Sequence, residues 1–213
     1  MIAATSLAGV GTVAFALWGI KTEEISKIAL MTAVFFVGST IHVPVGPTSV
    51  HLLLAGFTGL VIGNRTPIAV LTALLLQLFL LHLGGLASLG ANVVIQSLPA
   101  MLLGALLRSR LATANAATAF GCGLATGMAS VAGSTLLLAL LLIQSNQRFG
   151  MGPFSTVSAV IAGHFVLMFV EGFCTAFAVQ FIVGVRPDFF QVPNDESSLD
   201  FDDPPDPVHR NDC

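Results

Sequence analysis

A polar segment of eleven residues, Ile41-His-Val-Pro-Val-Gly-Pro-Thr-Ser-Val-His51, separates two long apolar runs of this chain. It places two imidazoles, two hydroxyl groups and two prolines at one end of those runs. Imidazole nitrogens bind Ni, Co, Cu and Zn ions. Polar groups that border hydrocarbon are costly unless satisfied, and they commonly mark the path of a ligand or an ion. The segment therefore predicts a metal-binding site at a membrane boundary.

His51 is the best ligand candidate in this segment. The Gly-Pro pair before Thr48 can bend the backbone, while Thr48 and Ser49 offer hydrogen bonds that would orient a liganding imidazole. The alternative is that Ser49 caps a helix beginning near His51, a role compatible with metal binding. His42, nine residues before His51, is a second candidate ligand, with a boundary or supporting role as its alternative.

Four further polar residues lie in or beside apolar runs. His82 stands next to a Gly-Gly pair and is expected to face water at the interface, which makes it a weak ligand candidate. Asn92 opens an apolar run and is expected to cap a helix or to shape the site. His164 and Glu171 are seven residues apart, so they share one face of the last helix. Glu171 is the only acid within the apolar runs, and we expect it to face the bundle interior in a structural or coupling role.

The composition indicates a membrane protein. Hydrophobic residues make up 55% of the 213 residues, charged residues make up 9%, and the mean hydropathy is +0.91. Apolar runs are separated by Gly, Pro and polar clusters, and a crossing helix needs about 20 apolar residues. We therefore predict an all-α bundle of about seven transmembrane helices. Their approximate spans are 2–20, 28–45, 51–63, 67–81, 92–107, 116–143 and 156–185.

The Lys and Arg residues predict the orientation of this bundle. With seven crossings, seven of the eight fall on one side, which the positive-inside rule assigns to the cytoplasm. The N-terminus is then outside, the C-terminus is inside, and the chain is a multi-pass protein of the cell (inner) membrane. The 42–51 segment lies on the outer face. A cleaved signal peptide over residues 1–20 is the alternative, but no Lys or Arg precedes that run and no clear cleavage site follows it.

The last part of the chain has a different composition. Eight of the eleven acids lie between Asp188 and Asp212, in a region rich in Asp, Pro and Ser. We predict a transmembrane metal-binding bundle over residues 1–185 and an acidic, disordered cytoplasmic tail over residues 186–213. The thinly spread basic residues form no patch that would suit nucleic acid.

Three blocks resemble the CbiM/NikM family, the cobalt- or nickel-binding membrane components of energy-coupling-factor transporters. Pro44-Val-Gly-Pro-Thr-Ser-Val-His51 resembles the loop that carries the family's metal-binding histidine. Leu75-Leu-Gln-Leu-Phe-Leu-Leu-His-Leu-Gly-Gly-Leu-Ala-Ser-Leu-Gly-Ala-Asn92 resembles the family's glycine-rich block, which is the most specific of the three. His164-x6-Glu171-Gly172 resembles the family's final motif. The blocks stand in family order and cover about residues 5–185.

The resemblance implies uptake of Co(II) or Ni(II), captured from the outer face by histidine and backbone nitrogens, with no permanently bound cofactor. It also implies partners: a coupling transmembrane subunit, ATPase subunits and, in some members, a small accessory membrane subunit. Family members begin Met-His and use that terminus in a near-planar nitrogen set with the loop histidine. This chain begins Met1-Ile2-Ala3, so we expect Met-His codons upstream of Met1, the alternative being a divergent member with an incomplete site.

Other functions fit the residues less well. The chain has no G-x-x-x-x-G-K-[ST] motif, so ATP hydrolysis is expected in separate subunits and this chain is not expected to be an enzyme. An intramembrane hydrolase is the least favoured alternative, because neither Ser39 nor Ser49 has a G-x-S-x-G context. A transporter component for an organic vitamin remains the main alternative, although Trp18 is the only Trp and Tyr is absent. The residues do not distinguish cobalt from nickel.

Overall fold

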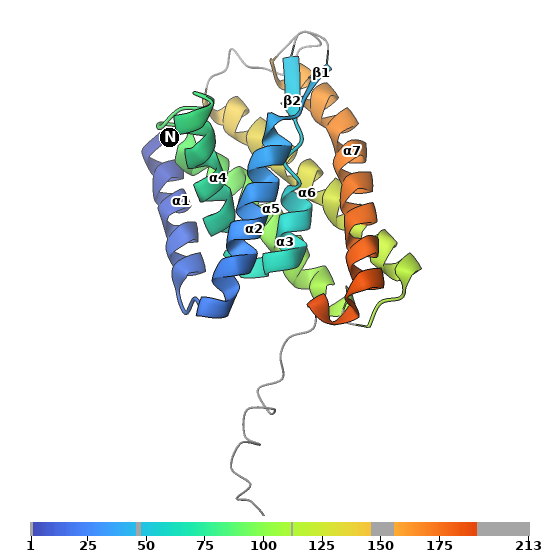
Figure 1. Ribbon diagram of the computed structural model, residues 1–213. Helices are drawn as coiled ribbons and strands as arrows, with labels where there is room; N and C mark the ends of the chain where they lie inside the picture. Colours follow the sequence, from blue (N-terminus) through green and yellow to red (C-terminus); the bar gives the residue numbers. More distant parts are fainter. Residues whose placement is uncertain (1, 46–47, 112, 146–155, 191–213) are drawn as a thin grey trace, which may run out of the picture.

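The computed structural model describes residues 2–45, 48–111, 113–145 and 156–190. These residues form a helical bundle with one short β-hairpin, which confirms the predicted all-α class and adds the hairpin (Figure 1). The elements are α1 (Ile2–Leu17), α2 (Thr22–Thr40), β1 (His42–Val45), β2 (Thr48–His51), α3 (Ala55–Ile62), η1 (Gly63–Arg65), α4 (Thr66–Leu80), α5 (Leu89–Leu111), α6 (Ala116–Ser145), α7 (Thr156–Val185) and η3 (Pro187–Phe190).

The bundle has two distinct ends in Figure 1. The hairpin end carries β1, β2 and the connection between α4 and α5, while the basic end carries the α1–α2 turn, η1 and the last turns of α5 and α7. Every Lys and Arg in the described part of the chain lies on an element at or near the basic end. These residues are Lys21, Lys27, Arg65, Arg108, Arg110 and Arg186. The predicted charge asymmetry is therefore present within the described residues.

Four described stretches are long and apolar enough to cross a membrane, namely Ala55–Leu80, Leu89–Leu111, Ala116–Gln144 and Val160–Val185. The first of them is broken at Gly63, which has φ +53°. In Figure 1, α3 descends to the basic end and α4 returns from it. The helix α1 is a shorter apolar helix, and α2 carries Glu and Lys in its first turns. The count of seven crossings thus stays a prediction.

The short helix α3 begins inside the bundle. Its eight residues are all buried, and it packs mainly against α5 and α6. It can do so because small residues meet at the crossing with α5: a side-chain carbon at Gly59 would overlap the Ala100 backbone, and one at Gly104 would overlap Gly59. Close approach through Gly and Ala is how membrane helices gain packing contacts. A half-length helix is stable here because it is enclosed on all sides.

The most extensive helix pair is α6 with α7. Gly123 and Gly127 of α6 are separated by one helical turn and face α7. A side-chain carbon at Gly123 would lie 2.7 Å from the Cα of Ala176, and one at Gly127 would lie 2.8 Å from the Cα of Gly172. This spacing is the small-xxx-small pattern of tightly packed membrane helices. The pair forms one firm wall of the bundle.

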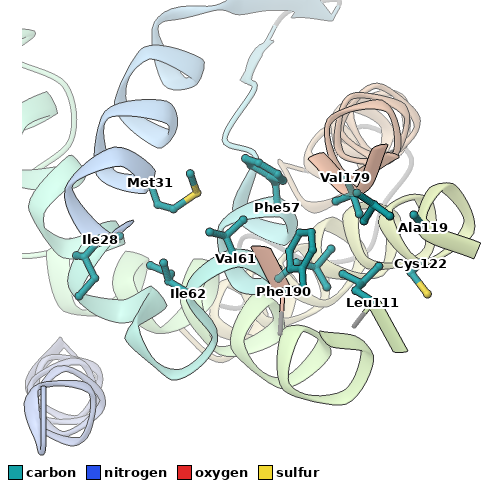
Figure 2. Packing of buried hydrophobic residues seen from close by; sticks show 13 residues of the cluster. Ile28, Met31, Phe57, Val61, Ile62, Leu111, Ala119, Cys122, Val179 and Phe190 are labelled. Carbon is teal, nitrogen blue, oxygen red and sulfur yellow. The ribbon is translucent and has the colours of Figure 1, made fainter. Parts of the chain in front are cut away.

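A hydrophobic core near the basic end joins α2, α3, α5, α6 and α7 (Figure 2). Phe190 of η3 is 1% exposed and belongs to this core. The packed bundle therefore extends to residue 190, beyond the domain boundary predicted at 185. Residues 191–213, which include most of the predicted tail, lie outside the described residues.

Candidate metal site

A cavity of about 310 Å³, with several polar side chains in its lining, lies in the hairpin half of the bundle. Its walls come from β2, α3, α4, α5, α6 and α7, and most of its lining is apolar. The polar residues in the lining are His51, Gln77, Asn92, Gln96, Ser130, Ser134, His164 and Glu171. Four residues singled out in the sequence, His51, Asn92, His164 and Glu171, thus line one space.

His51 is the last residue of β2 and is oriented by helix α2. The antiparallel register pairs His42 with His51, so the hairpin brings the two histidine positions directly opposite each other. The Nδ1 atom of His51 lies 3.1 Å from the Ser39 carbonyl oxygen. Because a carbonyl only accepts hydrogen bonds, Nδ1 carries a proton, and in the neutral ring Nε2 then carries the lone pair. This tautomer presents Nε2 as the nitrogen that could bind a metal.

The hairpin also corrects one alternative. Ser49 lies within β2, and the first helix after it, α3, is preceded by Leu54 in a left-handed conformation with φ +53°. Ser49 therefore does not cap a helix. The backbone register of His42, Thr48 and Ser49 is described, but their side chains lie outside the described part of the structure.

Glu171 connects helix α7 to the start of α3. Its side chain is 1% exposed, and Oε1 accepts a hydrogen bond of 2.6 Å from the backbone N–H of Leu53. Leu54, the N-cap residue of α3, forms no capping hydrogen bond with its side chain. A carboxylate near a helix N-terminus satisfies N–H groups and interacts favourably with the helix dipole. Glu171 thus fixes the three residues that join His51 to α3.

His164 lies two helical turns before Glu171 and lines the same cavity. Its Nδ1 lies 2.8 Å from the Val160 carbonyl oxygen, so it too has the proton on Nδ1 and the lone pair on Nε2. The expectation that His164 and Glu171 share one helix face is confirmed by their common place in the lining.

Four buried polar atoms of the cavity residues have no hydrogen-bond partner among the described residues. They are Gln77 Nε2, Gln96 Oε1, Ser130 Oγ and Glu171 Oε2. Buried polar atoms are normally paired with protein groups, water or ions. Their concentration in one cavity indicates a space built for a polar or hydrated guest. Gln77, Gln96, Ser130 and Ser134 were not predicted as site residues. A polar residue within a long apolar run was the only available signal for them.

His82 faces outward, as expected, whereas Asn92 does not take its expected capping role. His82 is exposed, has φ +53° and does not line the cavity. Asn92 lines the cavity but does not cap a helix, because α5 begins at Leu89 and the Asn92 N–H already bonds the Ser88 carbonyl at 2.9 Å. The physical reason is that the Gly-Ala pair before Asn92 continues the helix rather than interrupting it.

Within the described residues, no three His, Cys, Asp or Glu side chains converge to hold a metal ion. The described side chains therefore offer single imidazoles and one carboxylate around a cavity rather than a closed coordination shell. A metal bound at His51 needs further donors, which backbone nitrogens or residues outside the described part would supply.

The long apolar helices and the cavity with its polar lining residues are the features of a membrane protein with an interior binding site. Residues 1–189 match the CbiM family, described as the cobalt uptake substrate-specific transmembrane region. The chain belongs to this family.

Relatives and solved structures agree with the family. A Haemophilus influenzae protein named for a proposed role in metal transport is 42% identical over 111 residues, which cover 52% of this chain and 54% of that protein. The match thus spans about half the length of this relative. A Haloquadratum walsbyi protein with a similar name is 28% identical over 183 residues, covering 84% of this chain and 82% of that protein.

Two solved structures share the fold at 20% identity. A truncated transition metal transporter has a TM-score of 0.67 over 86% of this chain and 91% of that chain. A second transition metal transporter has a TM-score of 0.67 and covers 86% of both chains. At this identity, the likeness establishes the fold. The family and these neighbours are transport proteins rather than enzymes.

Proposed function

We propose that this protein is the substrate-binding membrane component of an ATP-driven uptake transporter for Co(II) or Ni(II). Metal arrives at the hairpin end from outside, and His51 is its principal ligand. The observation that carries the proposal is the orientation of His51: the Ser39 carbonyl holds Nδ1 so that Nε2 bears the lone pair. That imidazole belongs to a cavity in which four buried polar atoms have no partner.

The other predicted residues take supporting roles in this proposal. His42, opposite His51 in the hairpin register, is the second candidate donor. Thr48, Ser49 and Asn92 shape or support the site, and His82, exposed and outside the cavity, is not a ligand. Glu171 positions the segment that joins the hairpin to α3 through its hydrogen bond with the Leu53 N–H. His164 belongs with Glu171 as a structural or coupling residue on α7.

The partners in this proposal follow from the family match. Separate ATPase subunits and a coupling transmembrane subunit would supply the energy, in keeping with the lack of a nucleotide-binding loop in this sequence. Metal is cargo rather than a resident cofactor. The proposed location is the cell membrane, with the basic end in the cytoplasm, because all described Lys and Arg residues lie near that end.

The function is tested by calorimetry on the purified wild-type protein with Co(II), Ni(II) and Mg(II) chlorides. We expect Co(II) or Ni(II) to bind in the micromolar range or tighter and Mg(II) to show no comparable binding, because imidazole prefers the transition metals. Riboflavin and biotin are titrated in the same way to test the alternative that the substrate is an organic vitamin. Binding of either vitamin without binding of either transition metal would refute the proposal.

The orientation is tested by labelling single cysteines in intact cells with a membrane-impermeant maleimide. The natural cysteines are first changed to alanine. We expect Ser88→Cys, at the hairpin end, to be labelled, and Asn64→Cys and Ser109→Cys, at the basic end, to be protected. All three positions are exposed, so access to the reagent depends on the side of the membrane. Labelling of Asn64→Cys with protection of Ser88→Cys would show that the bundle is inverted.

A further inference from the structure

A second cavity, of about 430 Å³, lies at the basic end of the bundle, apart from the proposed metal site. It is bounded by the end of α1, the first turn of α2, η1 and the last turns of α5. Three charged side chains line it, Glu24, Arg65 and Arg108, together with the aromatic residues Phe15 and Trp18. The proposed transport function assigns no role to this cavity.

Arg65 and Glu24 already have hydrogen-bond and ion-pair partners within the protein. Arg65 donates from Nη1 to the carbonyl oxygens of Ala16 at 2.6 Å and Trp18 at 2.8 Å, and from Nη2 to Gly19 at 2.7 Å. Its Nε and Nη2 also meet Glu24 Oε2, each at 3.0 Å. Arg65 therefore closes the α1–α2 turn onto η1, and Glu24 neutralises it.

Arg108 is the second cation in this cavity, and its charge is not paired in the way that the charge of Arg65 is. Its Nε is buried and has no hydrogen-bond partner within the described part of the chain. No described carboxylate forms an ion pair with Arg108, although Glu24 attracts it at longer range. With one carboxylate against two guanidinium groups, the lining carries one excess positive charge. A buried guanidinium nitrogen without a partner is costly, so an anion that accepts its hydrogen bond is expected.

The rim of the cavity is suited to an amphiphile rather than to a small free anion. Trp18 is 85% exposed and Phe15 is 56% exposed. On α5, Ala105 of the lining adjoins Leu106, which is 70% exposed. Exposed apolar side chains on a membrane helix face lipid, and Trp is enriched where hydrocarbon meets headgroups. The cavity thus opens toward the surface where acyl chains would lie.

We propose that this cavity binds the headgroup phosphate of an anionic phospholipid, with Arg108 as its main contact and Phe15 and Trp18 beside the glycerol and first acyl carbons. Guanidinium groups bind phosphate through strong charge-assisted hydrogen bonds, and basic pockets between membrane helices are recognised lipid sites. The inference goes beyond the proposed function, and its readout requires no metal.

The test is native mass spectrometry and thermal unfolding of the purified full chain in detergent with dioleoyl phosphatidylglycerol or dioleoyl phosphatidylcholine. We expect phosphatidylglycerol to bind preferentially and to raise Tm, and Arg108→Gln to weaken that binding about fivefold, the effect of one basic residue near an anionic headgroup. Arg110→Gln is the matched control, because Arg110 is an exposed residue of the same last turn of α5. It should retain wild-type lipid binding.

Each alternative has its own outcome. Equal binding of the two lipids to wild type would overturn the proposal, even if Arg108→Gln failed to fold. Equal lipid binding by Arg108→Gln and wild type would overturn the role of Arg108. If sodium phosphate alone produced the full rise in Tm, the occupant would be a free anion. If Arg108→Gln lost only the capture of a coupling subunit, with no lipid effect, the cavity would be a protein contact.

Discussion

Replacing His51 with alanine is expected to weaken Co(II) or Ni(II) binding at least about a hundredfold. Losing a group that merely orients a ligand already costs about 10–100-fold in metal affinity, and losing the ligand itself costs more. His51 is the described imidazole whose proton is fixed on Nδ1 by a carbonyl outside its own element, so its Nε2 is held in one direction. The measurement is calorimetry on purified protein.

His82→Ala is the matched control for this prediction. His82 is also a histidine at the hairpin end, but it is exposed and lies outside the cavity, so the variant should keep wild-type affinity. Far-UV circular dichroism of both variants checks that the bundle is intact. Equal metal affinities for wild type and His51→Ala would refute the assignment of His51, whatever the behaviour of His82→Ala.

The helices could be located from the sequence because lipid-facing and buried positions are both apolar. Five of the seven predicted runs correspond to helices that begin and end within four residues of the expected bounds. The run 28–45 differs more, because α2 spans Thr22–Thr40 and the last four residues of the run form β1. The run 51–63 also differs. That run contains the end of β2 and the short α3. Its apolar composition fits a crossing helix, but the left-handed Leu54 and Gly63 limit α3 to eight residues. Composition does not reveal at which depth inside the bundle a buried helix begins.

The cavity could be predicted only in part. His51, His164 and Glu171 stand out because ionisable residues are rare in apolar runs and must find an interior position. Gln77, Gln96 and Ser130 are neutral, and their contribution depends on the rotation of α4, α5 and α6 about their own axes. With hydrophobic residues on every face of these helices, periodicity does not define that rotation. The three-dimensional packing alone brings these polar groups together.

Glu171 connects helix α7 to the segment that carries the proposed metal ligand His51. Its Oε1 holds the Leu53 N–H, two residues after His51, while its Oε2 is unpartnered beside the cavity. The segment between His51 and α3 therefore has one end fixed by α2, through the Ser39 carbonyl, and the other by α7. Loss of the second attachment should affect both stability and metal binding.

Glu171→Ala is expected to destabilise the protein by about 2–3 kcal/mol, because the Leu53 N–H becomes a buried donor without an acceptor and the start of α3 loses its cap. For a chain of this size, that corresponds to a fall in Tm of roughly 5–10 °C. Metal affinity should fall about 10–100-fold, the effect of losing a group that positions a ligand. Thermal unfolding in detergent and calorimetry measure the two quantities.

Two variants separate this role from a general effect of altering a buried side chain on α7. Thr175→Val removes a buried hydroxyl, one turn from Glu171, that has no partner among the residues the structure describes. It should leave Tm and metal affinity unchanged. Glu171→Gln keeps an oxygen that can accept from the Leu53 N–H, so it should recover most of the Tm lost in Glu171→Ala.

If Glu171→Ala melted at the wild-type temperature, the hydrogen bond between Glu171 and the start of α3 would contribute nothing to stability. If Glu171→Gln recovered Tm but not metal affinity, the carboxylate would act on the cation through its charge as well as through the position of His51.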